Sequence, residues 1–335
     1  MVRVLITADL HLSANPRDAY RFKFMERLLR LIDKYEVDSL LVLGDLTEMK
    51  DYHGSELVNR IAGYFARYAA KVPVLITRGN HDGTDPNHPF YQFLSHIPGI
   101  SWVNSPTEDA GDAFGPAIYL PHTSNYKKDW EGINFDKFRW IFAHNTFAGA
   151  QGEYGHILDG IPLDTFPADA RVISGDIHVP QKIGCVRYVG APYTVDFGDS
   201  YEPRCLLLER DTLRSIKLGG PQKRLITADV SFPANERVYK GLDVCRPGDI
   251  LKVRVTVKRE HAAKWPEFKQ AVREWGEKNQ FIIDTVQPVI AEMDAKRRAD
   301  AFFKTPKRSA EQIVRDYAAS RGIDDLTLKA GMKFL

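Results

Sequence analysis

Five short stretches of the chain carry side chains that bind metal ions, and each stretch follows an apolar run. They are Ala8-Asp9-Leu10-His11, Gly44-Asp45-Leu46-Thr47-Glu48, Gly79-Asn80-His81-Asp82, Ala143-His144-Asn145 and Gly175-Asp176-Ile177-His178. Because apolar, β-branched runs predict buried strands, each stretch is expected where a strand ends and a loop begins. Carboxylates, imidazoles and an amide oxygen brought together there are suitable ligands for two divalent cations.

The spacing within the stretches indicates what each side chain can do. Asp9 and His11 are two residues apart, so both can point the same way and bind one cation. Asp45 follows Gly44, which lets the backbone turn sharply and leaves the carboxylate able to bridge two cations. The further candidate ligands are Asn80, His144, Asp176 and His178.

This ligand set predicts hydrolysis of a phosphate ester. Two cations ~3.5–4 Å apart can activate a water and stabilise charge on a phosphoryl oxygen. His81 adjoins a candidate ligand, and outside the metal shell it can protonate the leaving oxygen as a general acid. We therefore predict His81 as the catalytic residue. Glu48 and Asp82 are expected to position ligands, and His122, which follows a predicted strand, could reach the rim of the site.

The first hundred or so residues alternate between strand-like and helix-like patterns. Strands are predicted over Val2–Thr7, Ser39–Leu43 and Val72–Thr77, and helices over Arg17–Tyr35 and Glu56–Ala70. This order implies parallel strands that helices bury on both faces. Such sheets carry their ligand-binding loops at the carboxyl ends of the strands, where the motifs fall.

Further along the chain the helical pattern weakens and short strands are predicted instead. They cover Ala117–Leu120, Arg139–Ala143, Arg171–Ser174, Val186–Val189, Cys205–Glu209 and Arg214–Leu218. We expect them to form a second sheet packed on the first, in a four-layer α/β/β/α sandwich. The connection from Asn145 to Ala170 is long and rich in Gly and Pro, so it is expected to line the active site.

The cluster Gly219-Gly220-Pro221 predicts a domain boundary, with a catalytic domain over residues 1–219. Residues 220–294 then form a small α+β cap, a possible DNA-binding accessory domain. Its predicted strand, helix and strand cover Ile250–Val257, Lys264–Lys278 and Gln280–Thr285. Residues 295–335 form a basic tail whose helix begins at the capping box Ser309-Ala310-Glu311-Gln312.

Composition limits where the protein works. The 335 residues carry a net charge of +2, so any nucleic-acid surface must come from where the charges lie. Three widely spaced cysteines predict neither a zinc site nor a disulfide framework and suit a reducing cytoplasm. No signal peptide is predicted, and no apolar run reaches the ~20 residues of a membrane span. We expect a cytoplasmic protein without membrane contact.

The order and spacing of the five stretches resemble the calcineurin-like metallophosphoesterases, whose motifs run D-x-H, G-D, G-N-H-D/E, H and G-H-x-H. The resemblance covers roughly residues 1–210 and implies His81 as the catalytic histidine. It assigns one cation to Asp9, His11, Asp45 and His178, and the second to Asp45, Asn80, His144 and Asp176. The family usually has histidine where this chain has Asp176. A carboxylate there can ligate, favouring Mn²⁺ or Mg²⁺, can loosen the second cation, or can only accept a hydrogen bond from a histidine.

Within that family the chain is most similar to the SbcD/Mre11 DNA exonucleases. The similarity lies in the loop and helix after His11-Leu12, in Val179-Pro180-Gln181, in Tyr188-Val189-Gly190-Ala191-Pro192 and in Val195-Asp196-Phe197-Gly198-Asp199. It implies a DNA exonuclease or endonuclease that uses two divalent cations, Mn²⁺ or alternatively Mg²⁺. It also implies an SbcC/Rad50-like ATPase as partner in DNA repair or recombination, with the basic tail as the candidate docking segment.

Several alternatives stay open at the level of sequence. Arg17, Tyr20 and Arg21 are candidate DNA contacts, because Arg and polar side chains bind phosphates, or they are solvated residues at a helix start. A homodimer is a further possibility, with Glu56–Ala70 and Pro89–His96 as candidate interfaces. The alternative function is a metallophosphodiesterase for a nucleotide or cyclic nucleotide, and a non-catalytic scaffold is the third hypothesis.

Overall fold

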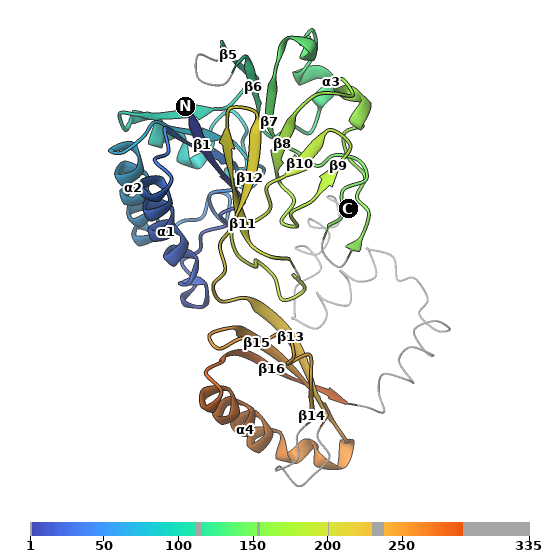
Figure 1. Cartoon of the computed structure of the whole chain (residues 1–335). Helices are drawn as coiled ribbons and strands as arrows, with labels where there is room; N and C mark the ends of the chain where they lie inside the picture. Colours follow the sequence, from blue (N-terminus) through green and yellow to red (C-terminus); the bar gives the residue numbers. More distant parts are fainter. Residues whose placement is uncertain (1, 111–114, 153–154, 200, 230–237, 291–335) are drawn as a thin grey trace, which may run out of the picture.

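The structure is a computed structural model that describes residues 2–110, 115–152, 155–199, 201–229 and 238–290. Strands in these residues form three sheets (Figure 1). The predicted tail at 295–335 lies outside the described residues, so its role in docking a partner stays a prediction. Among the described helices, none combines the length and the apolar character needed to cross a membrane.

The first sheet is built on the strands that the apolar pattern predicts near the N-terminus. Its parallel strands are β1 (Arg3–Ala8), β2 (Ser39–Leu43), β3 (Val74–Thr77) and β4 (Ile100–Val103). Helices α1 (Arg21–Lys34) and α2 (Ser55–Ala69) cover one face. Side chains alternate along β1, so Leu5 packs with the helices while Val4 and Ile6 pack with the second sheet. Both faces of the sheet are therefore buried. The expectation of helices on both faces was wrong, because the second sheet covers the face opposite α1 and α2.

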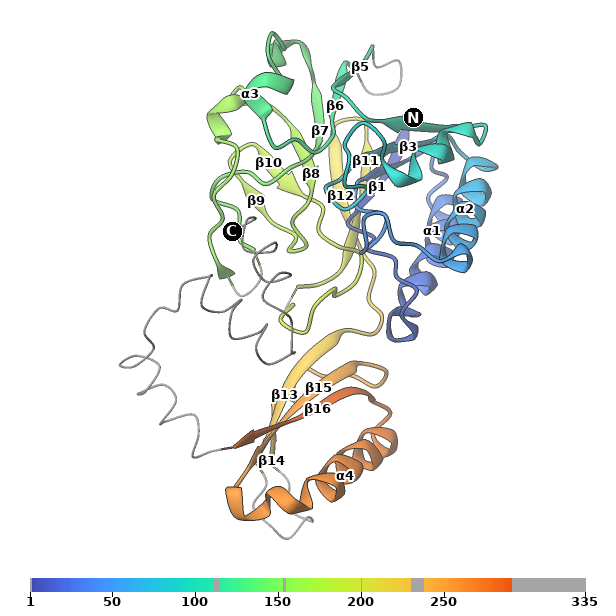
Figure 2. The same cartoon turned by 180° about the vertical axis from the view of Figure 1, so that it is seen from behind.

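The second sheet packs against the first on the side opposite α1 and α2 (Figure 2). Its parallel strands are β6 (Ala117–Leu120), β7 (Trp140–His144), β8 (Val172–Gly175) and β10 (Val186–Tyr188), flanked by β5 (Thr107–Asp109) and β9 (Lys182–Ile183). Its outer face is covered by loops and the short helix α3 (Tyr126–Asp129), which enclose Trp130, Phe147 and Phe166. The predicted α/β sandwich is confirmed, with an outer layer made mainly of loops.

Two strands that the sequence analysis assigned to the second sheet lie in the first. β11 (Arg204–Glu209) pairs antiparallel with β1, and β12 (Thr212–Lys217) pairs antiparallel with β11. The assignment was wrong because an apolar run records burial and not the partner strand. Leu206 faces the second sheet while Leu207 faces the helices, so β11 has the same two-sided burial as β1.

The third sheet consists of parallel β13 (Lys223–Asp229), β15 (Ile250–Val257) and β16 (Ile282–Ile290), with β14 (Val238–Lys240) antiparallel at one edge. Helix α4 (Trp265–Lys278) packs on it through Phe268 and Val272. The sheet contacts the loop that follows β1: Lys223 Nζ lies 3.3 Å from Asp18 Oδ1, and Arg17 Nε lies 3.4 Å from Asp284 Oδ1. The boundary at residues 219 and 220 stays a prediction.

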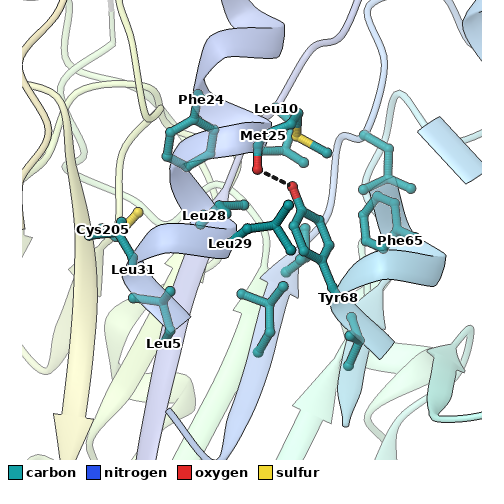
Figure 3. Packing of buried hydrophobic residues seen from close by; sticks show 14 of the residues in the cluster. Leu5, Leu10, Phe24, Met25, Leu28, Leu29, Leu31, Phe65, Tyr68 and Cys205 are labelled. Atoms are coloured by element: carbon teal, nitrogen blue, oxygen red, sulfur yellow. Dashed lines mark hydrogen bonds between the residues drawn. The ribbon is translucent and has the colours of Figure 1, made fainter. Parts of the chain in front are cut away.

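The core between the first sheet and its helices follows from the helical spacing of apolar residues in α1. Met25 and Leu28 have no exposed surface, and Leu31 and Phe24 are nearly as deeply buried (Figure 3). The hydroxyl of Tyr68 on α2 donates to the Met25 carbonyl at 2.8 Å and joins the two helices (Figure 3). One apolar stripe on each helix therefore supports the strands that carry the motifs.

We expect Leu28→Ala to lower the free energy of unfolding by about 2–5 kcal/mol, because the cavity that it leaves is fully enclosed. Arg30→Ala, an exposed change on the same helix, is the control and should change that free energy by less than ~0.5 kcal/mol. Urea denaturation followed by circular dichroism measures both. Equal losses in the two variants would contradict the packing in Figure 3.

Candidate metal centre

The carboxyl ends of five strands bring the five motifs to one edge of the two sheets. β1 and β2 end side by side at Ala8 and Leu43, and β7 and β8 end side by side at His144 and Gly175. The neighbouring loops stay paired beyond the strands, since the His11 amide donates to the Asp45 carbonyl at 2.9 Å. This is the edge at which parallel sheets place ligands.

The backbone is left-handed at four of the predicted ligands. The φ angles are 54° at Asp9, 40° at His11, 56° at Asp45 and 81° at Asp176. Residues other than glycine rarely adopt positive φ, and those that do gather at functional sites. The strain is confined to the first residues after the strands, where the chain must turn to bring the donors together.

Two glycines are needed because donor groups occupy the space that a side chain would fill. A Cβ at Gly79 would collide with the Asp45 carboxylate, and a Cβ at Gly44 would collide with the His144 imidazole. Glycine therefore precedes Asn80 and Asp45 for close approach as well as for turning.

The first group of donors surrounds one oxygen of Asp45. His11 Nε2 lies 3.0 Å from His178 Nε2 and 3.5 Å from Asp45 Oδ2. Asp9, His11 and Asp45 each offer a ligand atom, and these atoms lie within 4.8 Å of one another. The lone pairs of these groups converge on one space, an arrangement that a cation satisfies.

The second group surrounds the other oxygen of Asp45. His144 Nε2 lies 3.1 Å from Asn80 Oδ1, 3.4 Å from Asp45 Oδ1 and 3.7 Å from Asp176 Oδ1. His144 Nδ1 donates to the Leu43 carbonyl at 2.7 Å, which leaves Nε2 to face the donors. Asp45 thus presents one oxygen to each group, which is the arrangement that a bridging carboxylate needs.

Asp176 lies in the second group, at the position where the resemblance expects histidine. One of its oxygens accepts a hydrogen bond from the Thr146 hydroxyl, and the other faces His144. Its amide donates to Asp9 Oδ1 at 2.9 Å. The sequence analysis missed Thr146, because a lone threonine in a long loop has no pattern that marks it. The role of Asp176 as a ligand stays a prediction.

In the described residues the ion-pair partners of the buried Asp45 carboxylate are histidines, and the state of these carboxylates tests whether a metal fits. Asp9 Oδ2 is buried and has no hydrogen-bond partner within the described ranges. Burial raises the pKa of Asp9 to about 8. Burial opposes ionisation of Asp45 as well, yet the charge of His144 holds the pKa of Asp45 below its usual range. Oxygen and imidazole donors around buried carboxylates fit Mn²⁺ or Mg²⁺. The identity of the metal stays a prediction.

Asp82 is buried behind the donors and positions two motifs. Its Oδ2 accepts from the amides of Asp45 at 3.0 Å and Gly79 at 2.6 Å, and its Oδ1 accepts from Leu46 at 2.8 Å. These bonds tie the loop after β2 to the loop after β3. Asp82 therefore fixes the direction of the Asp45 carboxylate.

Glu48 lies behind His11. Its Oε2 is 3.4 Å from His11 Nδ1 and 3.5 Å from Arg21 Nη1. A carboxylate at Nδ1 favours the tautomer whose Nε2 lone pair faces the cation. Glu48 thus lies on the Nδ1 side of the imidazole and beside Arg21, although His11 Nδ1 has no hydrogen-bond partner among the described residues.

The candidate DNA contacts differ in exposure. Arg21 is 3% exposed, donates to the His11 carbonyl and lies 3.2 Å from Asp18, so its guanidinium is part of the framework of the site. Its role as a phosphate contact stays a prediction. The Tyr20 hydroxyl donates to the Thr194 carbonyl at 2.8 Å. Arg17 has 64% of its side chain exposed and stays a candidate.

His81 lies beside both groups, on their solvent side. Its amide donates to Asp45 Oδ1 at 2.8 Å, and its ring lies 5.0 Å from that of His11. Its Nδ1 lies 3.0 Å from the Glu48 carbonyl, which can only accept, so Nδ1 carries the hydrogen. Nε2 is then the atom that can exchange a proton with substrate.

A cavity of about 390 Å³ opens beside Asp176 and His178. Gly152, His156 and Leu158 of the long connection between β7 and β8 line its other side. The loop predicted to line the active site therefore does lie next to the donors.

Comparisons with known proteins agree with this geometry. A family model described as calcineurin-like phosphoesterase matches residues 2–180. A search of curated proteins finds no significant match.

Among solved structures, the chain is similar to a dimetal phosphatase from Danio rerio, with 8% identity and a TM-score of 0.39 over 65% of this chain and 99% of that one. It is also similar to nuclease MPE from Pseudomonas putida, with 15% identity and a TM-score of 0.33 over 64% and 87%. At this level of similarity neither neighbour identifies a substrate.

We expect Asp45→Ala to lower the affinity for Mn²⁺ by at least ~100-fold, because the variant loses the oxygens that face both groups. Isothermal titration calorimetry on the metal-free protein measures the affinity, and the wild type should bind about two ions per chain. Asp164→Asn, an exposed change outside the site, should bind like the wild type. Wild-type affinity in Asp45→Ala would contradict the bridging assignment.

Glu48→Ala should weaken Mn²⁺ binding by about 10-fold without unfolding the protein, because His11 loses the group that orients it. The same calorimetry measures this, with Glu131→Ala as an exposed, charge-matched control. If Glu48→Ala and the control bind Mn²⁺ equally well, Glu48 does not position His11.

Proposed function

The chain belongs to the calcineurin-like phosphoesterase family, and on that premise we propose that it is a two-metal nuclease of the SbcD/Mre11 type. Its substrate is a phosphodiester bond of DNA, hydrolysed as an exonuclease or endonuclease. The observation that carries the proposal is the pair of donor groups that share Asp45. When bound, the cations supply Lewis-acid stabilisation of charge on the phosphoryl oxygens and activate water.

The residues of the chain perform the remaining steps. Asp45 and Asp82 hold the donors in place before substrate arrives, so little rearrangement is needed during reaction. His81 projects its Nε2 from the edge of the donor groups and supplies a proton to the leaving oxygen. Such a proton is needed because a sugar alkoxide is a poor leaving group.

The third sheet supports a substrate larger than a nucleotide. It contacts the loop between Asp9 and α1 through the pairs Asp18–Lys223 and Arg17–Asp284. The Lys223 amide also donates to Thr194 Oγ1 at 2.6 Å. These contacts place a separate β-sheet beside the metal-binding edge, where a polynucleotide would extend beyond the scissile bond.

The segment that resembles SbcD/Mre11 packs directly under the first motif. The Tyr193 hydroxyl donates to the Leu10 carbonyl, and the Ala191 amide donates to the His178 carbonyl at 3.0 Å. Ala191 belongs to one of the segments behind the finer resemblance, and Tyr193 lies between two of them, so these segments pack beside the loops that carry His11 and His178.

An SbcC/Rad50-like ATPase is the partner that we propose on the same resemblance. The candidate docking segment over residues 295–335 lies outside the described residues. A homodimer through Glu56–Ala70 or Pro89–His96 also stays a prediction.

With Mn²⁺, the purified protein should degrade linear DNA, and EDTA should abolish the activity until Mn²⁺ is restored. His81→Ala should lower the rate by about 10²–10⁴-fold while Mn²⁺ affinity is retained, because a general acid is lost and no ligand is removed. His88→Ala, on a histidine whose side chain is 83% exposed, is the matched control. A gel assay of end-labelled duplex and single strands gives the rates.

A small chromogenic phosphodiester separates this function from the alternative. Faster turnover of that compound or of a cyclic nucleotide than of DNA would favour the small-substrate phosphodiesterase. Robust DNA cleavage by His81→Ala would refute the assignment of His81.

A further inference from the structure

A recess borders the second donor group on the side away from His178. One part of it has a volume of about 250 Å³ and is lined by Lys50, Arg78, Asn80 and His122. A neighbouring cavity of about 460 Å³ shares Arg78, Pro86, His122, Thr123 and Asp129 with it. Because Asn80 is a predicted ligand, the recess starts at the metal centre itself.

Arg78 is a buried cation on which two carboxylates, those of Asp82 and Asp129, act from beyond ion-pair distance. Arg78 is 9% exposed. Its guanidinium makes no ion pair within 4.0 Å in the part of the chain that the structure describes. Its guanidinium donates to neutral acceptors only, Asn104 Oδ1 at 2.9 Å and the His122 carbonyl. Burying this charge is costly, and the carboxylates of Asp82 and Asp129 offset the cost only in part, because burial still lowers the pKa of Arg78. The adjoining recess is therefore a favourable place for a further anion.

His122 offers a second unsatisfied group in the same recess. Its Nδ1 is buried and has no hydrogen-bond partner among the described residues. Its ring lies 6.4 Å from that of His144, and its amide donates to the Arg78 carbonyl at 2.9 Å. His122 thus connects the second donor group to Arg78.

The rest of the lining is rich in donors. Lys50 is exposed and adds a second positive charge, and Thr84, Thr123 and Ser124 add hydroxyl groups. Asp129 is the one acidic residue of the lining, and its carboxylate accepts from the Thr123 hydroxyl. The charged side chains of the recess are therefore two cations and one anion.

We propose that this recess binds a second phosphate group of the substrate, next to the phosphate that is hydrolysed. The proposal rests on the proposed function, because it identifies the substrate as a strand with consecutive phosphates. In a DNA strand the neighbouring phosphate is one nucleotide from the scissile bond. The recess begins at Asn80, a predicted ligand of the metal centre, so it lies on the path of such a strand. Arg78 and Lys50 bind that phosphate, and the hydroxyl groups complete its hydrogen bonds.

The test compares substrates that differ by one phosphate. They are an unphosphorylated dinucleotide, the same dinucleotide with a 5′- or 3′-terminal phosphate, and bis(p-nitrophenyl) phosphate. The wild type with Mn²⁺ should show kcat/KM about 10- to 100-fold higher for one phosphorylated dinucleotide than for the unphosphorylated one. In Lys50→Gln this ratio should fall about 10-fold.

Two further variants sharpen the comparison. Arg78→Gln should also lower this ratio of kcat/KM values, and circular dichroism shows whether the variant folds. If it unfolds, Lys50→Gln still tests the proposal, because it changes an exposed side chain. Lys137→Gln, an exposed lysine outside the recess, is the charge-matched control and should keep the wild-type ratio. An unchanged ratio in Lys50→Gln and in folded Arg78→Gln, or an equal loss on all substrates, would overturn the proposal.

A failure of the proposed function would give a different result from a failure of the recess proposal. If the wild type with Mn²⁺ hydrolyses neither these substrates nor linear DNA, the nuclease assignment fails. Calorimetric binding of the phosphorylated dinucleotide in EDTA then tests the recess alone. The wild type should then bind it about 10-fold more tightly than Lys50→Gln does. Equal binding by both proteins would overturn the proposal.

Discussion

The buried carboxylate of Asp45 has to face two groups of donors at once, and much of the surrounding structure serves that requirement. Asp82 accepts from the Asp45 amide, which fixes the direction of the loop. Gly79 leaves room for the Asp45 oxygens, and Gly44 leaves room for the imidazole of His144. The positive φ of Asp45 lies at the turn between strand and loop, where the chain must change direction. Packing on both faces of β2 supports this local strain.

Charge links the donor groups to the residues around them. The carboxylates of the site are buried with histidines as their nearest potential cations, so their ionisation depends on what else binds there. Arg21 and Arg78 are both buried close to the donors, yet their surroundings differ. Arg21 has Asp18 and Glu48 within 3.5 Å, and so it is part of the framework. Arg78 donates hydrogen bonds only to neutral acceptors, the carboxylates of Asp82 and Asp129 lie farther away, and its side chain lines the recess.

The local sequence pattern predicts a strand best where the residues of the strand and its immediate neighbours show the whole pattern. Ser39–Leu43 and Ile250–Val257 are strands over the predicted residues, because their apolar runs are bounded by polar and turn-forming neighbours. The edge strand Thr107–Asp109 was not predicted, since its three residues are exposed and lack an apolar pattern. Arg204–Glu209 was predicted as a strand and placed in the wrong sheet, because pairing with β1 depends on residues 200 positions away.

The sequence by itself determined which residue types stand after which strands, and therefore the five motifs, the family and the seven predicted ligands. Those signals are local: an apolar run, a glycine and a donor lie within a few residues of one another. Only the tertiary structure decided that Asp45 faces both donor groups and that Thr146 orients Asp176. It also decided that Arg21 is buried beside carboxylates while Arg78 donates hydrogen bonds only to neutral acceptors. The burial of a side chain and the charges around it depend on segments that are distant in sequence and close in space. The order of residues along one chain does not show which segments come together.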